Sequence, residues 1–235
     1  MKRPSHTDFP AAFCYRAHMS GTPSLCGVIL AAGESTRMGR DKALLPWPPA
    51  STGGSAPATQ TFLAAAIQSL MPFSDMVIVV AGKNALNLAP LVYANGAQLA
   101  ENPAPERGQF SSLQVGLHEV MNHGRDAAMV TLVDRPPVSA VTLQTLAEAF
   151  AAALSRRQWA VVPEYEGKHG HPILIGREMV EAFLRAPATA TARDIEHLNQ
   201  QHIAYLPVTD PFVTMNVDTP EEYSALFASV LSPRK

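Results

Sequence analysis

Short apolar runs that alternate with segments of helical periodicity constrain the fold of this chain more than any other feature of its sequence. The runs lie at 26–32, 76–81, 127–133 and 159–163. Their length and their content of Val, Ile and Ala are typical of buried strands. Strands that alternate with helices predict an α/β fold with a mainly parallel central sheet and helices on both faces. Sheets of this kind bind ligands at the carboxyl ends of their strands.

Between these runs, three segments carry helix signals. Apolar residues recur three or four positions apart in 139–154 and 111–121, and Ser139 and Ser111 are placed as N-caps. A Gln three positions after Ser111 predicts a capping box there. The sequence Thr-Pro-Glu-Glu at 219–222 predicts a further helix start, with Thr as the cap and Pro at the first helical position.

The composition indicates one globular domain, with a tail before it and a long loop within it. Hydrophobic residues make up 47% of the 235 residues, enough for a sizeable core. We expect a single domain over 25–235, preceded by a flexible tail over 1–24, which lacks the apolar segment of a secretory signal. Residues 46–58 are rich in Pro and Gly, which predicts a long surface loop.

Charge and cysteine content exclude several classes of protein. The net charge is −2 and there is no basic run, which argues against a nucleic-acid-binding protein. No apolar stretch reaches the roughly 18 residues that cross a membrane. The two cysteines, Cys14 and Cys26, do not form a disulfide framework and are typical of a reducing compartment. We therefore expect a cytoplasmic protein without nucleic-acid or membrane partners.

The first apolar run ends in a loop suited to phosphate. Small residues at its end are followed by Gly33 and then by the cations Arg37 and Lys42. Small side chains allow backbone N–H groups to approach an anion, and the cations add positive charge. The glycine spacing fits neither a Walker loop nor a dinucleotide-binding motif. By itself the pattern also fits an ordinary strand-to-helix turn with solvated cations.

The same loop carries a resemblance to a known family. The segment LAAGESTRMGRDKALLP at 30–46 is similar to the signature of the MobA-like nucleotidyltransferases. The LAAG form and a GHP segment are closest to the molybdenum cofactor cytidylyltransferases within that family. The resemblance covers about residues 26–228. Four further segments occur in the order of the family: ENPAPERGQFSSLQVGL (101–117), LVDRPPV (132–138), GHPILIGRE (170–178) and NVDTPEEY (216–223).

The resemblance implies a Rossmann-like nucleotide-diphosphate transferase fold and a Mg²⁺-dependent transferase. The reaction it implies moves CMP from CTP to the molybdopterin form of molybdenum cofactor by in-line attack and releases pyrophosphate. A molybdenum hydroxylase is then a potential recipient of the product. Two alternatives stay open: a related enzyme that uses GTP or another phosphate acceptor, and a non-catalytic carrier or chaperone of the cofactor. Retention of Lys42, Asp134 and Asp218 argues against the carrier, which needs neither metal ligands nor leaving-group charges.

By position, the resemblance assigns roles to individual residues. Arg37, Lys42 and Asp134 are the expected catalytic residues, because two anionic reactants need positive charge and fixed geometry more than a strong base. Asp134 and Asp218 are the expected Mg²⁺ ligands, since Mg²⁺ takes one or two carboxylates together with phosphate oxygens. The expected nucleotide-binding residues are Leu30, Ala31, Ala32, Gly33, Lys42, Asn102 and Ser112.

The GHP segment is expected to face the acceptor, through Gly170, His171 and Pro172. A lone histidine is more often structural than catalytic, and each aspartate could instead cap a helix or form an ion pair. The chain departs from the family at Arg135, where Gln or Met is common. We expect Arg135 to add positive charge beside Asp134.

Overall fold

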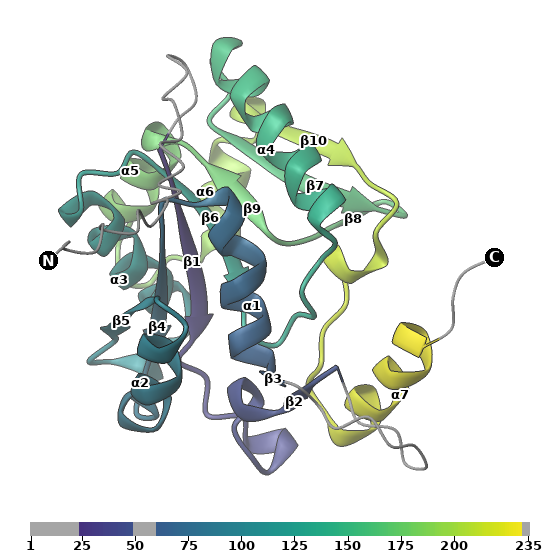
Figure 1. Cartoon of the computed structure of the whole chain (residues 1–235). Helices are drawn as coiled ribbons and strands as arrows, with labels where there is room; N and C mark the ends of the chain where they lie inside the picture. The colour runs from purple at the N-terminus through teal and green to yellow at the C-terminus, as the bar shows by residue number, and fades with distance from the viewer. Residues whose placement is uncertain (1–23, 49–59, 232–235) are drawn as a thin grey trace, which may run out of the picture.

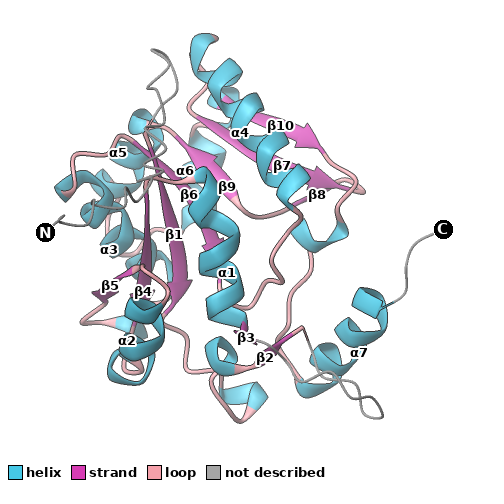
Figure 2. Cartoon of the chain, viewed as in Figure 1, coloured by secondary structure: helices cyan, strands magenta, loops and turns pink. Residues whose placement is uncertain are grey.

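The computed structural model of the protein describes residues 24–48 and 60–231 and shows a mixed eight-stranded sheet (Figures 1 and 2). The strand order is β10-β7-β9-β6-β1-β4-β5, with β8 paired to β7, and β2 and β3 form a separate two-stranded ribbon. The strands are β1 (Leu25–Ala31), β2 (Pro46–Trp47), β3 (Gln60–Thr61), β4 (Met76–Ala81), β5 (Gln98–Glu101), β6 (Ala127–Leu132), β7 (Ala160–Tyr165), β8 (Lys168–His169), β9 (Ile173–Ile175) and β10 (Ile203–Pro207).

Seven α-helices accompany the strands in the part of the chain that the structure describes. They are α1 (Phe62–Leu70), α2 (Ala85–Ala94), α3 (Gln109–Asn122), α4 (Ala140–Ser155), α5 (Arg177–Arg185), α6 (Ala192–Leu198) and α7 (Pro220–Leu231). None of the helices among the described residues combines the length and the apolar character that a membrane span requires.

The expectation of a mainly parallel sheet is confirmed. Strand β1 pairs in parallel with β4 on one side and β6 on the other, β4 with β5, and β7 with β10. The short strand β9 runs antiparallel to both β6 and β7, and β8 runs antiparallel to β7. All four predicted apolar runs are strands. The parallel pairing of β1, β4 and β6 brings their carboxyl ends to one edge of the sheet.

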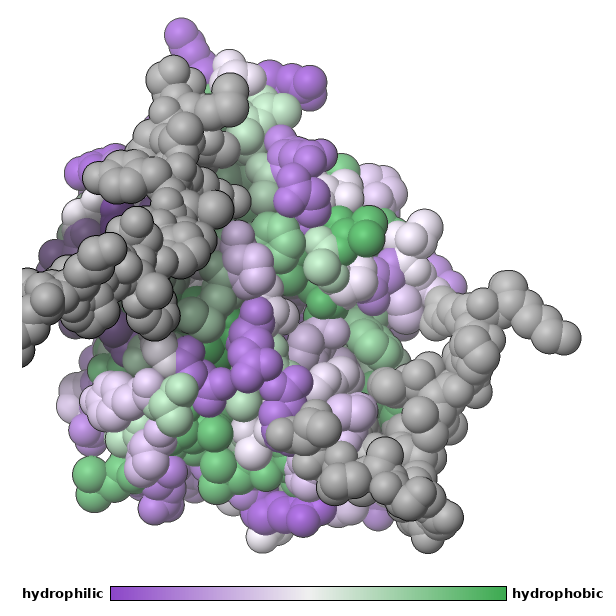
Figure 3. Space-filling view, in the orientation of Figure 1, coloured by the Kyte–Doolittle hydropathy of each residue, from purple (hydrophilic) through white to green (hydrophobic). Residues whose placement is uncertain are grey.

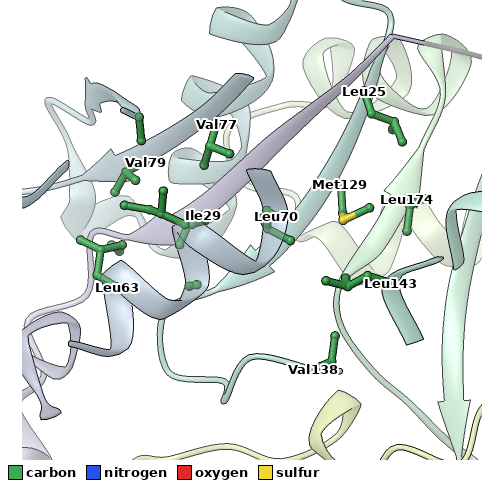
Figure 4. Packing of buried hydrophobic residues seen from close by; sticks show 14 of the residues in the cluster. Leu25, Ile29, Leu63, Leu70, Val77, Val79, Met129, Val138, Leu143 and Leu174 are labelled. Atoms are coloured by element: carbon green, nitrogen blue, oxygen red, sulfur yellow. The ribbon is translucent and has the colours of Figure 1, made fainter. Parts of the chain in front are cut away.

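Helices cover both faces of the sheet, as the alternation of elements predicts. On one face, Ile29 packs with residues of α1, α2 and α4, among them Leu63, Leu88 and Leu143. Figure 4 shows this cluster around Ile29, Met129 and Leu174. On the other face, Val28 packs with residues of α3, α5 and α6. The central strands are therefore buried on both sides, which explains their continuous apolar sequences.

Two of the three predicted helix starts are confirmed. Ser139 accepts a hydrogen bond from Thr142 N–H at the start of α4. Thr219 and the Glu three positions later form reciprocal bonds at the start of α7. The prediction at Ser111 is wrong, because α3 begins two residues earlier, at Gln109. Gly108, with a φ of +93°, ends the 3₁₀ helix Pro105–Arg107 and directly precedes α3. Ser111 lies in the first turn, and its hydroxyl donates back to Gly108 O.

A third, smaller core joins segments that lie far apart in the chain. Met38, Leu45, Phe62, Val217 and Leu226 are all buried in it. It joins the loop after β1 to the segment that leads into α7. The predicted surface loop at 46–58 begins in this region with β2, while residues 49–59 lie outside the described chain. The predicted tail also lies outside it, apart from residue 24.

Apolar side chains also reach the surface on α2. Leu86 and Tyr93, seven positions apart on this helix, are 90% and 62% exposed. In Figure 3, hydrophobic residues are visible at the lower left, where Figure 1 draws α2, among a surface of mixed hydropathy. Exposed apolar residues also occur singly on other helices, such as Val141 on α4 and Leu198 on α6.

Candidate active site

A cavity of about 270 Å³ opens where the carboxyl ends of β1 and β6 meet the start of α3. One wall comes from the end of β1 and the loop that follows, one from the end of β6, and one from the chain that enters α3. The lining residues are Leu30, Ala32, Gly33, Ser35, Lys42, Pro105, Gly108, Gln109, Ser112, Leu132, Val133 and Asp134. The cavity therefore lies at the edge of the sheet where ligand binding is expected.

A network of side-chain hydrogen bonds fixes the conformation of the loop after β1. The Asn84 amide donates to Ala31 O at 3.1 Å and to Asp41 Oδ2 at 2.7 Å. The other Asp41 oxygen accepts from Ala43 N–H. Ser35, which adopts a left-handed φ of 50°, accepts from the Lys42 N–H at 3.1 Å. These bonds fix the curvature of the loop and leave Gly33 in open space, where a Cβ would meet no other atom within 4 Å.

Two acidic side chains from distant parts of the sequence flank the Lys42 ammonium. Lys42 Nζ lies 2.5 Å from Asp218 Oδ1 and 3.6 Å from Asp134 Oδ2. The Lys42 side chain is only 11% exposed, whereas those of Asp134 and Asp218 are 27% and 22% exposed. The lysine ammonium is thus enclosed and compensated by two carboxylates that remain accessible from the solvent.

The position of Asp218 depends on backbone contacts on either side of it. The N–H of Val217 donates to Asp134 O at 2.8 Å, so the segment before α7 runs beside the end of β6. Glu222 Oε2 accepts from the N–H groups of Asp218 and Thr219 at 2.6 and 3.1 Å. The chain is therefore fixed both before and after the carboxylate that faces Lys42.

Cations set the ionisation of Asp218. Its hydrogen bond from Lys42 is the main cause that lowers the pKa of this carboxyl below its ordinary value. Arg37, whose guanidinium lies 3.3 Å from Asp218 Oδ1, lowers the pKa further. The Arg37 side chain is 68% exposed and can turn toward a ligand without leaving the solvent. Asp218 is ionised at neutral pH, as a metal ligand must be.

Asn102 lies behind the cavity wall. It is 3% exposed, and its amide nitrogen donates to the hydroxyls of Ser111 and Ser112, both at 2.9 Å. Its oxygen accepts from Ala104 N–H at 2.9 Å. Of these residues, Ser112 lines the cavity. The structure thus places Ser112 where it can meet a ligand, and Asn102 where it orients Ser112.

The three residues of the GHP segment lie next to Arg135 and do not line the cavity. Gly170 packs so closely on Val213 that a Cβ would overlap the Val213 carbonyl group. That carbonyl oxygen accepts hydrogen bonds from His171 N–H at 2.8 Å and from Arg135 at 2.9 Å. Pro172 shares a small recess with Arg135.

Burial controls the charges on this side of the site. Burial of the imidazole, with repulsion from Arg135 as a second cause, lowers the pKa of His171 to about 3, so the ring is neutral at physiological pH. Burial likewise lowers the pKa of Arg135, although Asp134 and Asp218 favour its charged form. Arg135 therefore adds a cation beside Asp134, while His171 can offer a ligand only a neutral ring.

The two aspartates have the donor chemistry that a divalent cation requires. Asp134 Oδ1 is buried and has no hydrogen-bond partner among the described residues, although Oδ2 of the same carboxylate faces Lys42. A carboxylate oxygen without a partner at the wall of a cavity is suited to an incoming cation. No group of three or more His, Cys, Asp or Glu side chains converges within 24–48 and 60–231. A cation held here would complete its shell with water or with oxygens of a bound ligand.

The structure brings most of the predicted residues together. Leu30, Ala32, Gly33, Lys42, Ser112 and Asp134 line one cavity, and Arg37 and Asp218 contact each other beside it. Ala31 points into the core, and only its carbonyl takes part, through Asn84. Sequence reasoning gave no role to Asn84, Asp41, Gln109 or Pro105, although the last three lie in the segments at 30–46 and 101–117 that carry the resemblance. Asn84 lies outside those segments, and its residue type carries no signal because Asn is common in any loop.

Known proteins of similar sequence and structure carry related names. The family model of the MobA-like NTP transferase domain matches residues 27–204. A molybdenum cofactor cytidylyltransferase of Escherichia coli is 23% identical over 198 residues, which are 83% of this chain and 92% of that protein. A probable molybdenum cofactor guanylyltransferase of Rhodopirellula baltica is 31% identical over 128 residues, 54% of this chain and 56% of that protein.

A solved structure shares the fold as well. The structure of Rv0371c from Mycobacterium tuberculosis in complex with manganese is 25% identical. It superposes with a TM-score of 0.66 and covers 88% of this chain and 99% of the other. Because the family model covers most of the described chain, and the strands and loops that build the cavity lie within the match, this protein belongs to the MobA-like NTP transferase family and is a nucleotidyltransferase.

Proposed function

We propose that this protein transfers CMP from CTP to a molybdopterin-type cofactor and releases pyrophosphate. The observation that carries the proposal is the enclosed Lys42 ammonium between Asp134 and Asp218 at the wall of the cavity of about 270 Å³. The loop of small residues after β1 and the Lys42 ammonium can bind the phosphates of a triphosphate, and the two carboxylates can bind its metal ion. The molybdopterin acceptor is inferred from the names of the relatives.

In the proposed reaction, an oxygen of the acceptor phosphate attacks the α-phosphorus of the triphosphate. The bond from that phosphorus to the bridging oxygen breaks, and pyrophosphate leaves with the electron pair. The acceptor phosphate is already ionised, so no strong base is needed. The open space around Gly33 allows the phosphates to approach the loop backbone. Lys42 and Arg37 stabilise the negative charge that develops on the leaving group.

Asp134 and Asp218 would hold the divalent cation that the family uses, which we propose is Mg²⁺. The unpaired Asp134 Oδ1 and the ionised Asp218 supply hard oxygen ligands, and phosphate oxygens would complete the shell. When bound, the metal neutralises phosphate charge in the crowded site. The manganese complex of a relative that is 25% identical supports a divalent cation in this fold.

Two observations support CTP over GTP as the donor. The LAAG sequence at 30–33 is the form found in the cytidylyltransferase subgroup. The cytidylyltransferase relative also matches over 83% of this chain, against 54% for the guanylyltransferase relative. GTP remains the second candidate, because the guanylyltransferase is the more similar of the two over the part that it matches, at 31% identity. Fold and metal ligands are the same for both donors, since base choice depends on a few loop contacts.

Pyrophosphate release tests the proposal directly. The full-length protein is incubated with Mg²⁺, one nucleoside triphosphate at a time and molybdopterin-type cofactor, and pyrophosphate is measured. Release with CTP supports the proposal, and release with GTP alone assigns the second candidate. Release with a sugar phosphate in place of the cofactor identifies another acceptor. No release under any condition, together with tight binding of the cofactor, identifies a carrier. A molybdenum hydroxylase that is activated by the product would be the recipient.

A further inference from the structure

The charge of Lys42 is compensated by the same two groups that are the proposed metal ligands. Its side chain is 11% exposed, and an enclosed ammonium is unfavourable unless carboxylates or other acceptors surround it. Asp218 and Asp134 are the only carboxylates within ion-pair distance of Nζ in the described part of the chain. Without a ligand, the charge of Lys42 is therefore balanced by Asp134 and Asp218.

A divalent cation needs these same two carboxylates. Lys42 Nζ contacts Asp218 Oδ1 at 2.5 Å and Asp134 Oδ2 at 3.6 Å, so a metal on the remaining oxygens of these carboxylates would still lie close to the ammonium. The two positive charges would then share the same negative charge, and the ammonium would repel the incoming metal. The metal ion alone must therefore compete with a cation that the chain itself supplies.

A bound triphosphate removes this competition. Lys42 lines the cavity together with Gly33 and Ser35, so phosphate oxygens in that cavity lie within its reach. The phosphates would take over the compensation of the ammonium and at the same time offer ligands to the metal. Arg37, which shares Asp218 Oδ1 with Lys42, is exposed and can follow the phosphates in the same way.

We propose that Lys42 makes metal binding depend on the nucleotide: its contacts with Asp218 and Asp134 weaken binding of a divalent cation until a triphosphate draws the ammonium away. The inference rests on the proposed metal site. Because coupling between two ligands is reciprocal, the metal then strengthens nucleotide binding by the same factor. The metal enters the site together with its substrate, and the empty enzyme takes it up poorly.

Binding of Mn²⁺ alone to the full-length protein tests the proposal. Free Mn²⁺ is measured by electron paramagnetic resonance during titration of the wild type, Lys42→Met, Lys42→Gln and Lys42→Arg. A thermal melt of each variant shows that it is folded, and two neutral replacements are used so that a folding defect in one leaves the other. Arg40→Met is the matched control, because it removes a positive charge from the same loop, where no ion pair joins Arg40 to either aspartate in the described chain.

We expect Lys42→Met and Lys42→Gln to bind Mn²⁺ about tenfold more tightly than the wild type, a typical size for coupling between sites. Lys42→Arg and Arg40→Met are expected to stay within about twofold of the wild type, the first because it keeps the competing charge. Equal or weaker Mn²⁺ binding by both neutral variants would overturn the proposal. Asp134→Asn separates this failure from a failure of the metal site: if that variant binds Mn²⁺ like the wild type, the metal assignment itself is wrong.

Discussion

The backbone N–H of Val217 donates a 2.8 Å hydrogen bond to the carbonyl oxygen of Asp134. This bond joins the end of β6 to the segment before α7 and places Asp218 directly beside Asp134. Both carboxylates then face Lys42, which comes from a third part of the chain. The proposed metal site exists because these three segments meet at one edge of the sheet.

The first prediction concerns Asp134. Asp134→Asn keeps the shape of the side chain but removes the charge, so we expect the rate of pyrophosphate release to fall at least about a hundredfold. The melting temperature should change little, because Asp218, the nearer partner at 2.5 Å, still compensates the charge of Lys42. Asp126→Asn is the matched control, since Asp126 precedes the amino end of the same strand and pairs with Arg177 at the surface. Full activity of Asp134→Asn would rule out its proposed role.

The second prediction compares two glycines. A Cβ on Gly170 would overlap the Val213 carbonyl group, and we expect Gly170→Ala to destabilise the protein by about 3 kcal/mol. Gly33 has open space around it, so Gly33→Ala should fold normally but bind the nucleotide more weakly, because its methyl group projects toward the phosphates. Chemical denaturation and nucleotide titration measure the two effects. Equal stability of both variants would contradict the packing described for Gly170.

The third prediction concerns Asn102. Asn102→Ala removes three hydrogen bonds that hold Ser111, Ser112 and Ala104, and we expect a loss of about 2–3 kcal/mol of unfolding free energy. Without Asn102, Ser112 is free to rotate, so KM for the triphosphate should also rise. Ser112→Ala removes only one of these bonds and should cost about 1 kcal/mol while affecting the same KM. An Asn102→Ala protein with unchanged stability and KM would show that the network has no effect on the cavity.

The fourth prediction concerns the two buried groups behind Asp134. Burial is the main reason that the pKa of His171 falls to about 3, and the Arg135 charge lowers it further. Arg135→Met should therefore raise the pKa of His171 while burial keeps it below the ordinary value of 6.5. Nuclear magnetic resonance titration of the imidazole measures the change, with His171→Gln to assign the signal. Arg40→Met should leave this pKa where it is, and an unchanged His171 in Arg135→Met would contradict the proximity of the two groups.

The fifth prediction concerns alkaline pH. Burial in β1 raises the pKa of the Cys26 thiol from 9.0 to about 12. The folded protein therefore holds a proton that the unfolded chain releases above pH 9. The stability from this thiol is complete below pH 9 and is lost as the pH rises toward 12, at about 1.4 kcal/mol per pH unit. Denaturation curves between pH 8 and about 11 should show a shallower loss for Cys26→Ala than for the wild type. Parallel losses in the two proteins would show that this thiol does not contribute.

Local sequence is enough to predict four of the strands and two of the helix starts. Runs such as 76–81 are apolar throughout because β4 is buried on both faces, and that property is visible without a structure. Ser139 and Thr219 cap helices through contacts three residues away, which sequence also records. The prediction at Ser111 is wrong because the actual start of α3 depends on the unusual backbone of Gly108, which no capping pattern reveals.

The sequence by itself determined which groups the protein has for its chemistry: small residues at the end of a strand, two cations after them, and aspartates in two later segments. Only the tertiary structure decided how these groups meet. The hydrogen bond from Val217 to Asp134 brings the segment that carries Asp218 to the end of β6. Asp134 and Asp218 are the only carboxylates within ion-pair distance of Lys42 among the described residues. The tertiary structure also places Asn102 in hydrogen-bond contact with Ser111 and Ser112, and packs Gly170 against Val213, so that neither residue lines the cavity. Such contacts join residues far apart in the chain, and their distances follow from packing, which no local pattern encodes.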